Sequence, residues 1–365
     1  MQRVLHIIGK MDRAGAETML MNLYRNIDRE KFQFDFIVFT KDKGNYDDEI
    51  LELGGKIIPL IEKNAFRRMK ILEKFLISHP EYQIVHAHTL LSNAFHLFAA
   101  KKAKVPVRIS HSHNTLDKSS NSIKGKIYKH FSKKMIKKYS TDFIACGQGA
   151  AEFLYDANDK VLILPNSVDS KYLNEVGEGN KDYINNEFHV EENFLKLVQV
   201  GRLQEVKNHD FSIRLASLLK KKNIKFKMFF VGQGELLNTL KQKISDADLA
   251  NDIILTGLRA DVPKIMAGAD VLLMPSFYEG FPVTLVETQS IGLPAVISDK
   301  ISKEVDLDLG LIHFLALEEK LWFEKIINIK PIAGPTENKL EKIYKKGFDI
   351  YSSVEIMEKM YSSFL

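Results

Sequence analysis

The sequence predicts an α/β protein of two domains built on parallel sheets, and three observations lead to this fold class. First, short apolar runs alternate with helical segments, and a run such as Val271–Met274 is typical of a strand buried on both faces. Second, a chain of 365 residues exceeds what one hydrophobic core usually holds. Third, 45% hydrophobic and 27% charged residues are typical of a globular protein.

The most informative stretch, residues 271–298, predicts a strand, a loop, a helix and a second strand. The helix is expected from Pro282 to Ile291, because proline suits a first helical turn and Gly292 favours the end of a helix. Such a strand–loop–helix–strand unit places its loop at the edge of the sheet where α/β proteins bind ligands.

Two carboxylates flank the start of this predicted helix. Glu279 precedes the first turn by a few residues, and Glu287 leans back toward it because helical side chains tilt to the N-terminus. The first-turn N–H groups form an anion site, and Gly280 lets a phosphate approach the backbone. The alternative is one solvated loop acid and one exposed helix acid. The pair in this frame favours a sugar nucleotide.

Glu279 and Glu287, with seven residues between them and Gly280-Phe281-Pro282 after the first, resemble the E-x7-E motif of family 4 retaining glycosyltransferases. The chain is also similar to bacterial exopolysaccharide and capsular polysaccharide transferases. The resemblance implies the GT-B fold, two Rossmann-like domains facing a central cleft. An acceptor-binding domain is expected at residues 1–169 with about 350–365, where the C-terminal helix crosses back, and a nucleotide-sugar-binding domain at 170–349.

A second motif lies at the start of the second domain. Gly201-Arg202-Leu203 with Lys207 resembles the family's G-R-L…K motif, which implies that Arg202 and Lys207 bind the donor pyrophosphate. A departing diphosphate needs positive charge near it. The resemblance assigns Glu279 to the sugar hydroxyls and Glu287 to the ribose. The whole set expected to hold the donor is Gly15, Gly201, Arg202, Lys207, Gly232, Gly257, Leu258, Arg259, Glu279, Gly280, Phe281, Pro282, Val283, Thr284 and Glu287.

The motifs of the first domain match the family more loosely. Gly15 follows the first strand, but Ala14 stands where the family has a glycine, and a plain tight turn is the alternative. Asn166, in a stretch that resembles the family's P-N-G-[IV]-D, and His88, at a strand end, are expected to face the acceptor or the cleft.

The resemblance also implies a functional histidine in the loop expected at residues 111–114. Spacing does not choose between the two candidates, and we favour His113 over His111. A histidine with a pKa near neutral could accept a hydrogen bond or help to move a proton. The alternative is that both rings only hydrogen-bond the loop. The catalytic candidates are therefore Glu279, His113, His111, Arg202 and Lys207.

Residues 118–139 predict a basic amphipathic helix, because lysines are frequent and apolar residues recur at every fourth position. We expect this helix to lie on an anionic membrane surface near a lipid-linked acceptor. The alternative is that the apolar stripe packs on the domain and the lysines are solvated. Nucleic acid is not expected as a partner, because the sequence has no recognised nucleic-acid-binding motif. The stripe is Ile123, Ile127, Phe131, Met135 and Tyr139.

The resulting hypothesis is a retaining glycosyltransferase that moves a sugar from a nucleotide-sugar donor, UDP-linked on the family's precedent, to a lipid-linked or saccharide acceptor in bacterial surface polysaccharide biosynthesis. The alternatives are a GT-B-fold sugar-nucleotide 2-epimerase and a non-enzymatic nucleotide-sugar-binding scaffold protein. We expect no metal and no other cofactor, since no D-x-D motif lies in a matching context. The oligomeric state stays open.

The remaining expectations concern location and the less informative segments. The single Cys146 and the absence of a long apolar run favour a cytoplasmic protein, peripheral on the inner face of the membrane. Residues 170–194 are interpreted as an irregular linker. Residues 336–348 and 354–362 are expected to form the C-terminal helices.

Overall fold

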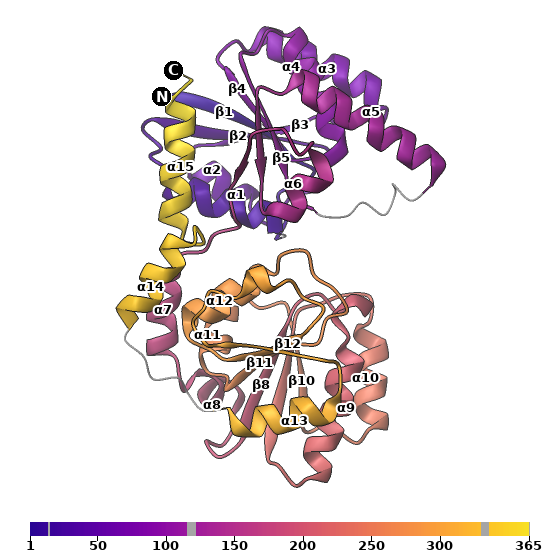
Figure 1. The fold of residues 1–365 in the computed structure, drawn as a ribbon, viewed down its shortest axis with the longest axis vertical. Helices are drawn as coiled ribbons and strands as arrows, with labels where there is room; N and C mark the ends of the chain where they lie inside the picture. Colours follow the sequence, from indigo (N-terminus) through magenta and orange to yellow (C-terminus); the bar gives the residue numbers. More distant parts are fainter. Residues whose placement is uncertain (14, 115–121, 330–335, 365) are drawn as a thin grey trace. The chain divides into compact units, whose positions relative to one another are not determined.

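The computed structural model describes residues 1–13, 15–114, 122–329 and 336–364. The chain divides into two compact units (Figure 1). The N-terminal unit comprises residues 1–167 and 347–365, and the C-terminal unit comprises residues 168–346. Within the described ranges, no helix is both long and apolar enough to cross a membrane.

The N-terminal unit is built on a parallel seven-stranded sheet with the strand order β3-β2-β1-β4-β5-β6-β7. Its elements are β1 (Gln2–Ile7), α1 (Gly15–Asn26), β2 (Phe32–Val38), α2 (Asp47–Glu52), β3 (Lys56–Pro59), α3 (Ala65–Ser78), β4 (Ile84–Ala87), η1 (Leu90–Ser92), α4 (Asn93–Lys102), β5 (Val107–Ser112), α5 (Ile123–Tyr139), β6 (Asp142–Ala145), α6 (Gln148–Leu154), β7 (Val161–Ile163) and α15 (Ile350–Ser362).

The C-terminal unit is built on a parallel six-stranded sheet with the order β10-β9-β8-β11-β12-β13. Its elements are α7 (Ser170–Gly179), α8 (Tyr183–Phe188), β8 (Leu195–Val200), η3 (Glu205–Lys207), α9 (His209–Lys221), β9 (Phe226–Val231), α10 (Leu237–Asp246), β10 (Ile253–Gly257), α11 (Val262–Ala267), β11 (Val271–Met274), α12 (Val283–Ile291), β12 (Ala295–Ser298), η4 (Lys303–Val305), β13 (Ile312–Leu315), α13 (Glu319–Asn328) and α14 (Thr336–Lys345).

Helices cover both faces of each sheet, as a sheet of near-continuous apolar strands requires (Figure 1). In the N-terminal unit, α1 and α15 share one core with the sheet, while α3 and α4 cover the other face. The last helix therefore belongs to the first unit, and the buried Tyr361 holds it there. In the C-terminal unit, α9, α10 and α13 form one layer, and α7, α11 and α12 pack together in the other. The predicted fold class is confirmed.

Each sheet has one point where the strand order reverses direction. In the N-terminal unit, that switch lies between β1 and β4, and in the C-terminal unit it lies between β8 and β11. Loops that leave the carboxyl ends of two such strands diverge to opposite faces of the sheet and leave a crevice for a ligand. The two switch points therefore mark where each unit is built to bind something.

The structure corrects three of the expected segments. Residues 170–194 are not an irregular linker, because they form α7 and α8 before β8 begins. The side chain of Asp169 caps α7 by accepting a hydrogen bond from the N–H of Tyr172, and Leu173 and Val176 are buried. His111 lies within β5 rather than in a loop. The segment after Ser298, which the sequence left undefined, contains β13 and α13.

Candidate functional site

The C-terminal unit brings the ends of its central strands into close contact through glycine. The N–H of Gly232, just after β9, donates to the carbonyl of Gly257 at the end of β10 over 3.0 Å. A Cβ atom on Gly232 would lie 2.1 Å from the carbonyl oxygen of Gly201, and its φ of +142° is one that other residues rarely adopt. The backbone at this edge therefore depends on glycine at position 232.

The predicted donor residues Lys207 and Glu279 form an ion pair at the switch point of this sheet. The Nζ atom of Lys207, in the loop after β8, lies 2.7 Å from Oε1 of Glu279, in the loop after β11. The hydroxyl of Ser276 donates to the same carboxylate oxygen over 2.6 Å. The side chains of Lys207 and Glu279 are 19% and 12% exposed, so the pair is largely shielded from water. Gly201 adjoins the lysine, because a Cβ there would lie 3.1 Å from its Cε.

Two further contacts hold the loops after β8 and β11 together. The side-chain amide of Asn208 donates to the carbonyl of Pro275 over 3.0 Å, and the N–H of Phe277 donates to the carbonyl of Val206 over 2.9 Å. Sequence reasoning missed Asn208 and Ser276 as supports of the site. Their positions, directly after Lys207 and three residues before Glu279, are the only signals that the sequence offered.

Helix α12 begins beside this pair with its first turn open. Pro282 is the N-cap, one residue earlier than its predicted place in the helix, and among the described residues no side chain caps the first turn. Val283 and Thr284 are partly buried there. No described atom lies within 4 Å of a Cβ built on Gly280. Gly292 ends the helix with φ of +92°, as predicted.

Glu287 lies on α12 as a partly buried carboxyl group. Within the described part of the chain, its side chain makes no hydrogen bond or ion pair. Burial raises the pKa of Glu287 to about 7, because the charged form is poorly solvated there. The group is thus close to half-protonated at neutral pH, and hydroxyl groups of a ligand would favour its ionised form.

The other predicted donor residues differ in how far they are engaged. The side chain of Arg202 is exposed, and in residues 122–329 and 336–364 no acidic side chain pairs with it. The guanidinium of Arg259 is held by the carboxylates of Asp261 and Glu187, at 2.8 and 2.6 Å, and lowers the pKa of Asp261 to about 2. Leu258 is 70% exposed. No hydrogen bond or ion pair between described residues joins Arg202, Arg259 or Glu287 to the Lys207–Glu279 pair.

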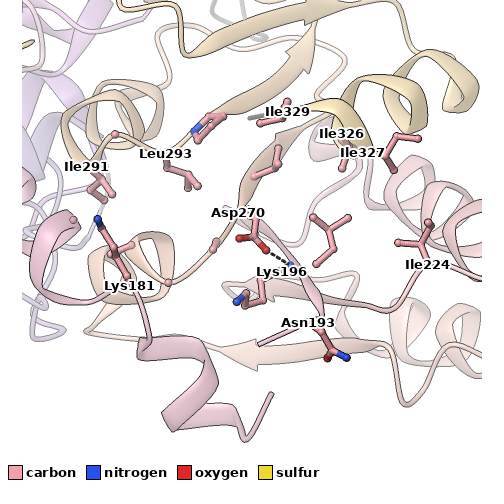
Figure 2. A pocket seen from close by; sticks show the side chains of 18 of the residues that line it. Lys181, Asn193, Lys196, Ile224, Asp270, Ile291, Leu293, Ile326, Ile327 and Ile329 are labelled. Atoms are coloured by element: carbon pink, nitrogen blue, oxygen red, sulfur yellow. Dashed lines mark hydrogen bonds between the residues drawn. The ribbon is translucent and has the colours of Figure 1, made fainter. Parts of the chain in front are cut away.

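A cavity of about 910 Å³ lies elsewhere in the C-terminal unit (Figure 2). It is lined by Lys196 at the start of β8, by Asp270 and by Pro294 before β12, and Figure 2 shows the bond from the Lys196 backbone to Asp270. Lys196 lies at the start of its strand, and Asp270 and Pro294 precede theirs, whereas Gly201 and Glu279 follow theirs. The cavity is therefore at the opposite edge of the sheet from the predicted donor residues.

In the N-terminal unit, Gly15 and Asn166 lie side by side. A Cβ on Gly15, the first residue of α1, would approach the Nδ2 atom of Asn166 to 4.0 Å. Asn166 is buried, and its Oδ1 atom accepts no hydrogen bond among the described residues. Ala14 lies outside the described residues.

The histidines predicted to face the acceptor belong to a larger buried group. The Nδ1 atom of His88 lies 2.9 Å from Nε2 of His113, and Nδ1 of His111 lies 3.2 Å from Nε2 of His86. Burial lowers the pKa of His113 to about 3 and places the pKa of His111 well below its usual value. His113 is therefore better suited to hydrogen bonding as a neutral ring than to moving a proton near neutral pH.

Two family profiles match separate parts of the chain. The profile described as Glycosyltransferase Family 4 matches residues 13–172, and the one described as Glycosyl transferases group 1 matches residues 180–306. The second match includes Lys207, Glu279 and Glu287.

Relatives and solved structures of known name are similar over nearly the whole chain. The putative glycosyltransferase EpsF of Bacillus subtilis is 35% identical and covers 99% of this chain and 96% of its own. The capsular polysaccharide biosynthesis glycosyltransferase CapH of Staphylococcus aureus is 26% identical, and the match covers 100% of this chain and 99% of CapH. The structure of HepE from Anabaena in complex with UDP superposes with a TM-score of 0.80 at 17% identity, covering 100% of both chains.

The glycosyltransferase WaaG also shares the fold, with a TM-score of 0.71, 17% identity and coverage of 98% and 99%. Both structural neighbours are too distant in sequence to say more than the fold. The match to EpsF over 99% of the chain, together with the two profiles, shows the family. The chain belongs to the family 4 (group 1) glycosyltransferases, and it is a glycosyltransferase enzyme of the GT-B fold.

Proposed function

We propose that this enzyme moves a sugar from a UDP-linked donor to a lipid-linked acceptor in bacterial surface polysaccharide biosynthesis, with retention of anomeric configuration. The observation that carries the donor half is the Lys207–Glu279 ion pair at the β8/β11 switch point, beside the open first turn of α12. The names of two similar proteins support the substrate class. One is a UDP-Gal:alpha-D-GlcNAc-diphosphoundecaprenol galactosyltransferase of Escherichia coli, 27% identical over 90% of this chain, and the other is HepE in complex with UDP-glucose.

In this proposal, the C-terminal unit holds the donor. Arg202 and the N–H groups of the first turn of α12 receive the diphosphate, and Gly280 leaves room for it. Lys207 is shared between the leaving phosphate and Glu279, which turns to the sugar hydroxyls. Glu287 accepts hydrogen bonds from the ribose. Positive charge from these groups serves the diphosphate without a metal ion.

Calorimetry with UDP, GDP and ADP tests the donor half. We expect UDP to bind best, and we expect Arg202→Ala and Glu287→Ala each to weaken binding by roughly 10- to 100-fold, the value of a charged hydrogen bond of about 1.5–3 kcal/mol. Arg214→Ala and Glu324→Ala are matched controls, because both side chains are exposed on α9 and α13 and neither belongs to the predicted site. Equal binding by the parent and the two site variants would contradict the assignment of Arg202 and Glu287 to the donor site.

The alternatives of a 2-epimerase and a scaffold protein are not favoured by the relatives, which are glycosyltransferases by name. Turnover separates the three. A transferase consumes UDP-sugar only with an acceptor, an epimerase consumes it alone, and a scaffold protein does neither. The anomeric configuration of the isolated product, read by NMR, tests retention.

We further propose that helix α5 docks the enzyme on an anionic membrane. Its buried face carries Ser132 and Ile136, whereas Ile123, Ile127 and Phe131 are 80%, 66% and 52% exposed. Three exposed apolar side chains one turn apart form a continuous surface stripe. The predicted five-residue stripe thus divides, since Met135 and Tyr139 are partly buried.

Exposed lysines accompany this apolar stripe. At 3.6 residues per turn, the side of the helix that carries the stripe also carries three exposed lysines, Lys124, Lys134 and Lys138. A face that combines apolar and basic side chains inserts into the headgroup region and is attracted by anionic lipid.

Sedimentation with vesicles tests the docking of α5. We expect binding to vesicles that contain phosphatidylglycerol and little binding to pure phosphatidylcholine. Lys124→Ser with Lys134→Ser should weaken binding roughly 10- to 30-fold, at about 1 kcal/mol per lysine. Lys221→Ser with Lys222→Ser is the charge-matched control at the end of α9. Equal losses in both double variants would mean that net charge, and not α5, determines binding.

A further inference from the structure

Five histidines gather on one side of the N-terminal sheet at its β1/β4 switch point. His6 on β1 lies opposite His86 on β4 in the strand register, and His88 and His113 follow their strands by one residue. Residues two apart on a strand face the same side, so His86 and His88 share a face, as do His111 and His113. The ring centroids of His111 and His113 are 4.0 Å apart, and those of His86 and His88 are 4.3 Å apart.

Two chains of hydrogen bonds run through this cluster. In the first, His88 lies between two rings, with Nε2 at 3.0 Å from Nδ1 of His6 and Nδ1 at 2.9 Å from Nε2 of His113. In the second, Nδ1 of His111 pairs with Nε2 of His86, whose Nδ1 lies 2.9 Å from the hydroxyl of Tyr361 on α15. His6 and His86 thus lie behind the other three rings and fix their orientation.

Three ring nitrogens at the ends of these chains make no hydrogen bond within residues 1–13, 15–114, 122–329 and 336–364. They are the buried Nε2 of His6, Nε2 of His111 and Nδ1 of His113. A neutral imidazole that donates from one nitrogen carries a lone pair on the other. When His111 donates to His86 through Nδ1, its Nε2 atom keeps a lone pair. Neutral imidazole is the form of histidine that binds metals.

We propose that His88, His111 and His113 bind one divalent transition-metal ion of the zinc, cobalt or nickel class. One ring nitrogen from each of the three lies within 4.8 Å of the others. On binding, His88 keeps the hydrogen bond from Nε2 to His6 and gives up the one between its Nδ1 and His113, so that Nδ1 can bind the ion. Zinc–imidazole bonds of about 2.0–2.1 Å place tetrahedral ligand nitrogens roughly 3.3 Å apart, so the rings need to close by about 1.5 Å at most. Imidazole suits these ions better than it suits magnesium or calcium.

The neighbouring trio of His6, His86 and His88 meets the same distance criterion but is less accessible. His6 and His86 are 0% and 1% exposed, whereas His113 is only partly buried and offers a path for an ion. In the proposed site, His6 and His86 instead act as outer partners that hold the ligand rings. Three protein ligands leave a fourth position for water or a substrate oxygen.

This metal site goes beyond the proposed donor chemistry and departs from the expectation of a metal-free enzyme. It lies in the N-terminal unit, whereas the residues assigned to the diphosphate lie in the C-terminal unit. The donor can therefore be bound without the metal. A negative result for metal binding would leave the proposed donor site standing, and a negative result for donor binding would leave the metal site standing.

Metal titration of the full-length chain, freed of any histidine tag and dialysed against EDTA, tests the site. Cobalt(II) is the probe, because histidine coordination gives it a visible absorption band, and zinc should displace it. We expect one ion per chain and, for His113→Gln, binding at least 10-fold weaker, because even the loss of an outer partner of a metal ligand costs about that much. His130→Gln and His79→Gln remove histidines outside the cluster and should bind like the parent.

His111→Gln is the second variant, and circular dichroism will show whether it folds, since His111 is fully buried. If it does not fold, His113→Gln decides alone, because its side chain is only partly buried after β5. The proposal is overturned if the parent binds no cobalt or zinc at micromolar concentration. It is equally overturned if His113→Gln binds as tightly as the parent.

Discussion

The two units share one topology and differ in what they bury. Each has a parallel sheet whose order reverses beside its first strand, β1 or β8. At that point the N-terminal unit buries neutral histidine rings. The C-terminal unit has the Lys207–Glu279 ion pair there, together with the partly buried carboxyl group of Glu287. Burial lowers the pKa of a histidine and raises that of a glutamate. The histidines at one switch point and Glu287 at the other should therefore contribute to stability with opposite dependence on pH.

The largest expected effect is acid unfolding of the N-terminal unit. Six of its histidines have pKa values lowered by burial, so in acid only the unfolded chain takes up protons at these sites: His6, His86, His88, His96, His111 and His113. Their contribution is intact above pH 6.5 and falls as the pH drops toward 3. Below pH 6.5, each further pH unit lowers the stability of this unit by up to about 1.4 kcal/mol for every ring that stays neutral in the fold.

The single tryptophan makes this unfolding measurable unit by unit. Trp322 is fully buried on α13, so its fluorescence reports on the C-terminal unit, while far-ultraviolet circular dichroism reports on both. With EDTA present, we expect ellipticity to fall near pH 5 before the fluorescence changes. His130→Gln, a change at an exposed ring, should leave both transitions in place. A single transition seen by both probes would contradict the expectation that the N-terminal unit unfolds first in acid.

The second effect concerns the ion pair in the C-terminal unit. Lys207→Met and Glu279→Gln, alone and combined, form a double-mutant cycle, and we expect a coupling free energy of about 1–3 kcal/mol because the pair is largely shielded from water. The measurement is urea unfolding followed by Trp322 fluorescence. The exposed Lys243–Asp210 pair is the matched control and should couple by under about 0.5 kcal/mol. Equal coupling in the two cycles would contradict a special role for the first pair.

Much of this site was predictable because its determinants are local. The bounds of β11 follow from a short apolar run and its flanking residues, and Gly292 ends α12 as the sequence predicts. Lys207 and Glu279 lie 72 residues apart, and the family resemblance assigned both to the donor, whereas their ion pair is seen only in the structure.

Other features depend on contacts that no local pattern contains. His6 belongs to the histidine cluster because the β1–β4 register sets it opposite His86. Tyr361 forms a hydrogen bond with His86 only because α15 returns to the first unit. Helix α7 was missed because its surface is polar, and only its packing against α11 and α12 shows why Leu173 is buried.

A third effect should have the opposite sign to that of the histidines. The pKa of Glu287 is raised from 4.5 to about 7, so its contribution to stability is full below pH 4.5 and is lost as the pH rises through 7. Allowing for partial exposure, we expect the C-terminal unit to lose about 1–2 kcal/mol from this group between pH 5 and pH 8. Urea unfolding of the parent and of Glu287→Gln at both pH values checks this. The variant should lack that difference, and an unchanged difference would assign it to other groups.

The smallest expected effect on stability comes from Gly280→Ala, and this makes it the most specific probe of the donor site. No described atom lies within 4 Å of the added methyl group, so the free energy of unfolding should change by less than about 0.5 kcal/mol. The methyl group nevertheless stands where a phosphate would approach the first turn of α12, so UDP affinity should fall about 10-fold or more. Gly232→Ala is the contrasting variant, because its methyl group meets the carbonyl of Gly201 at 2.1 Å and must destabilise the fold itself. If Gly280→Ala binds UDP as well as the parent, the diphosphate does not rest on this turn, and the charged loops of the C-terminal unit need another ligand to explain them.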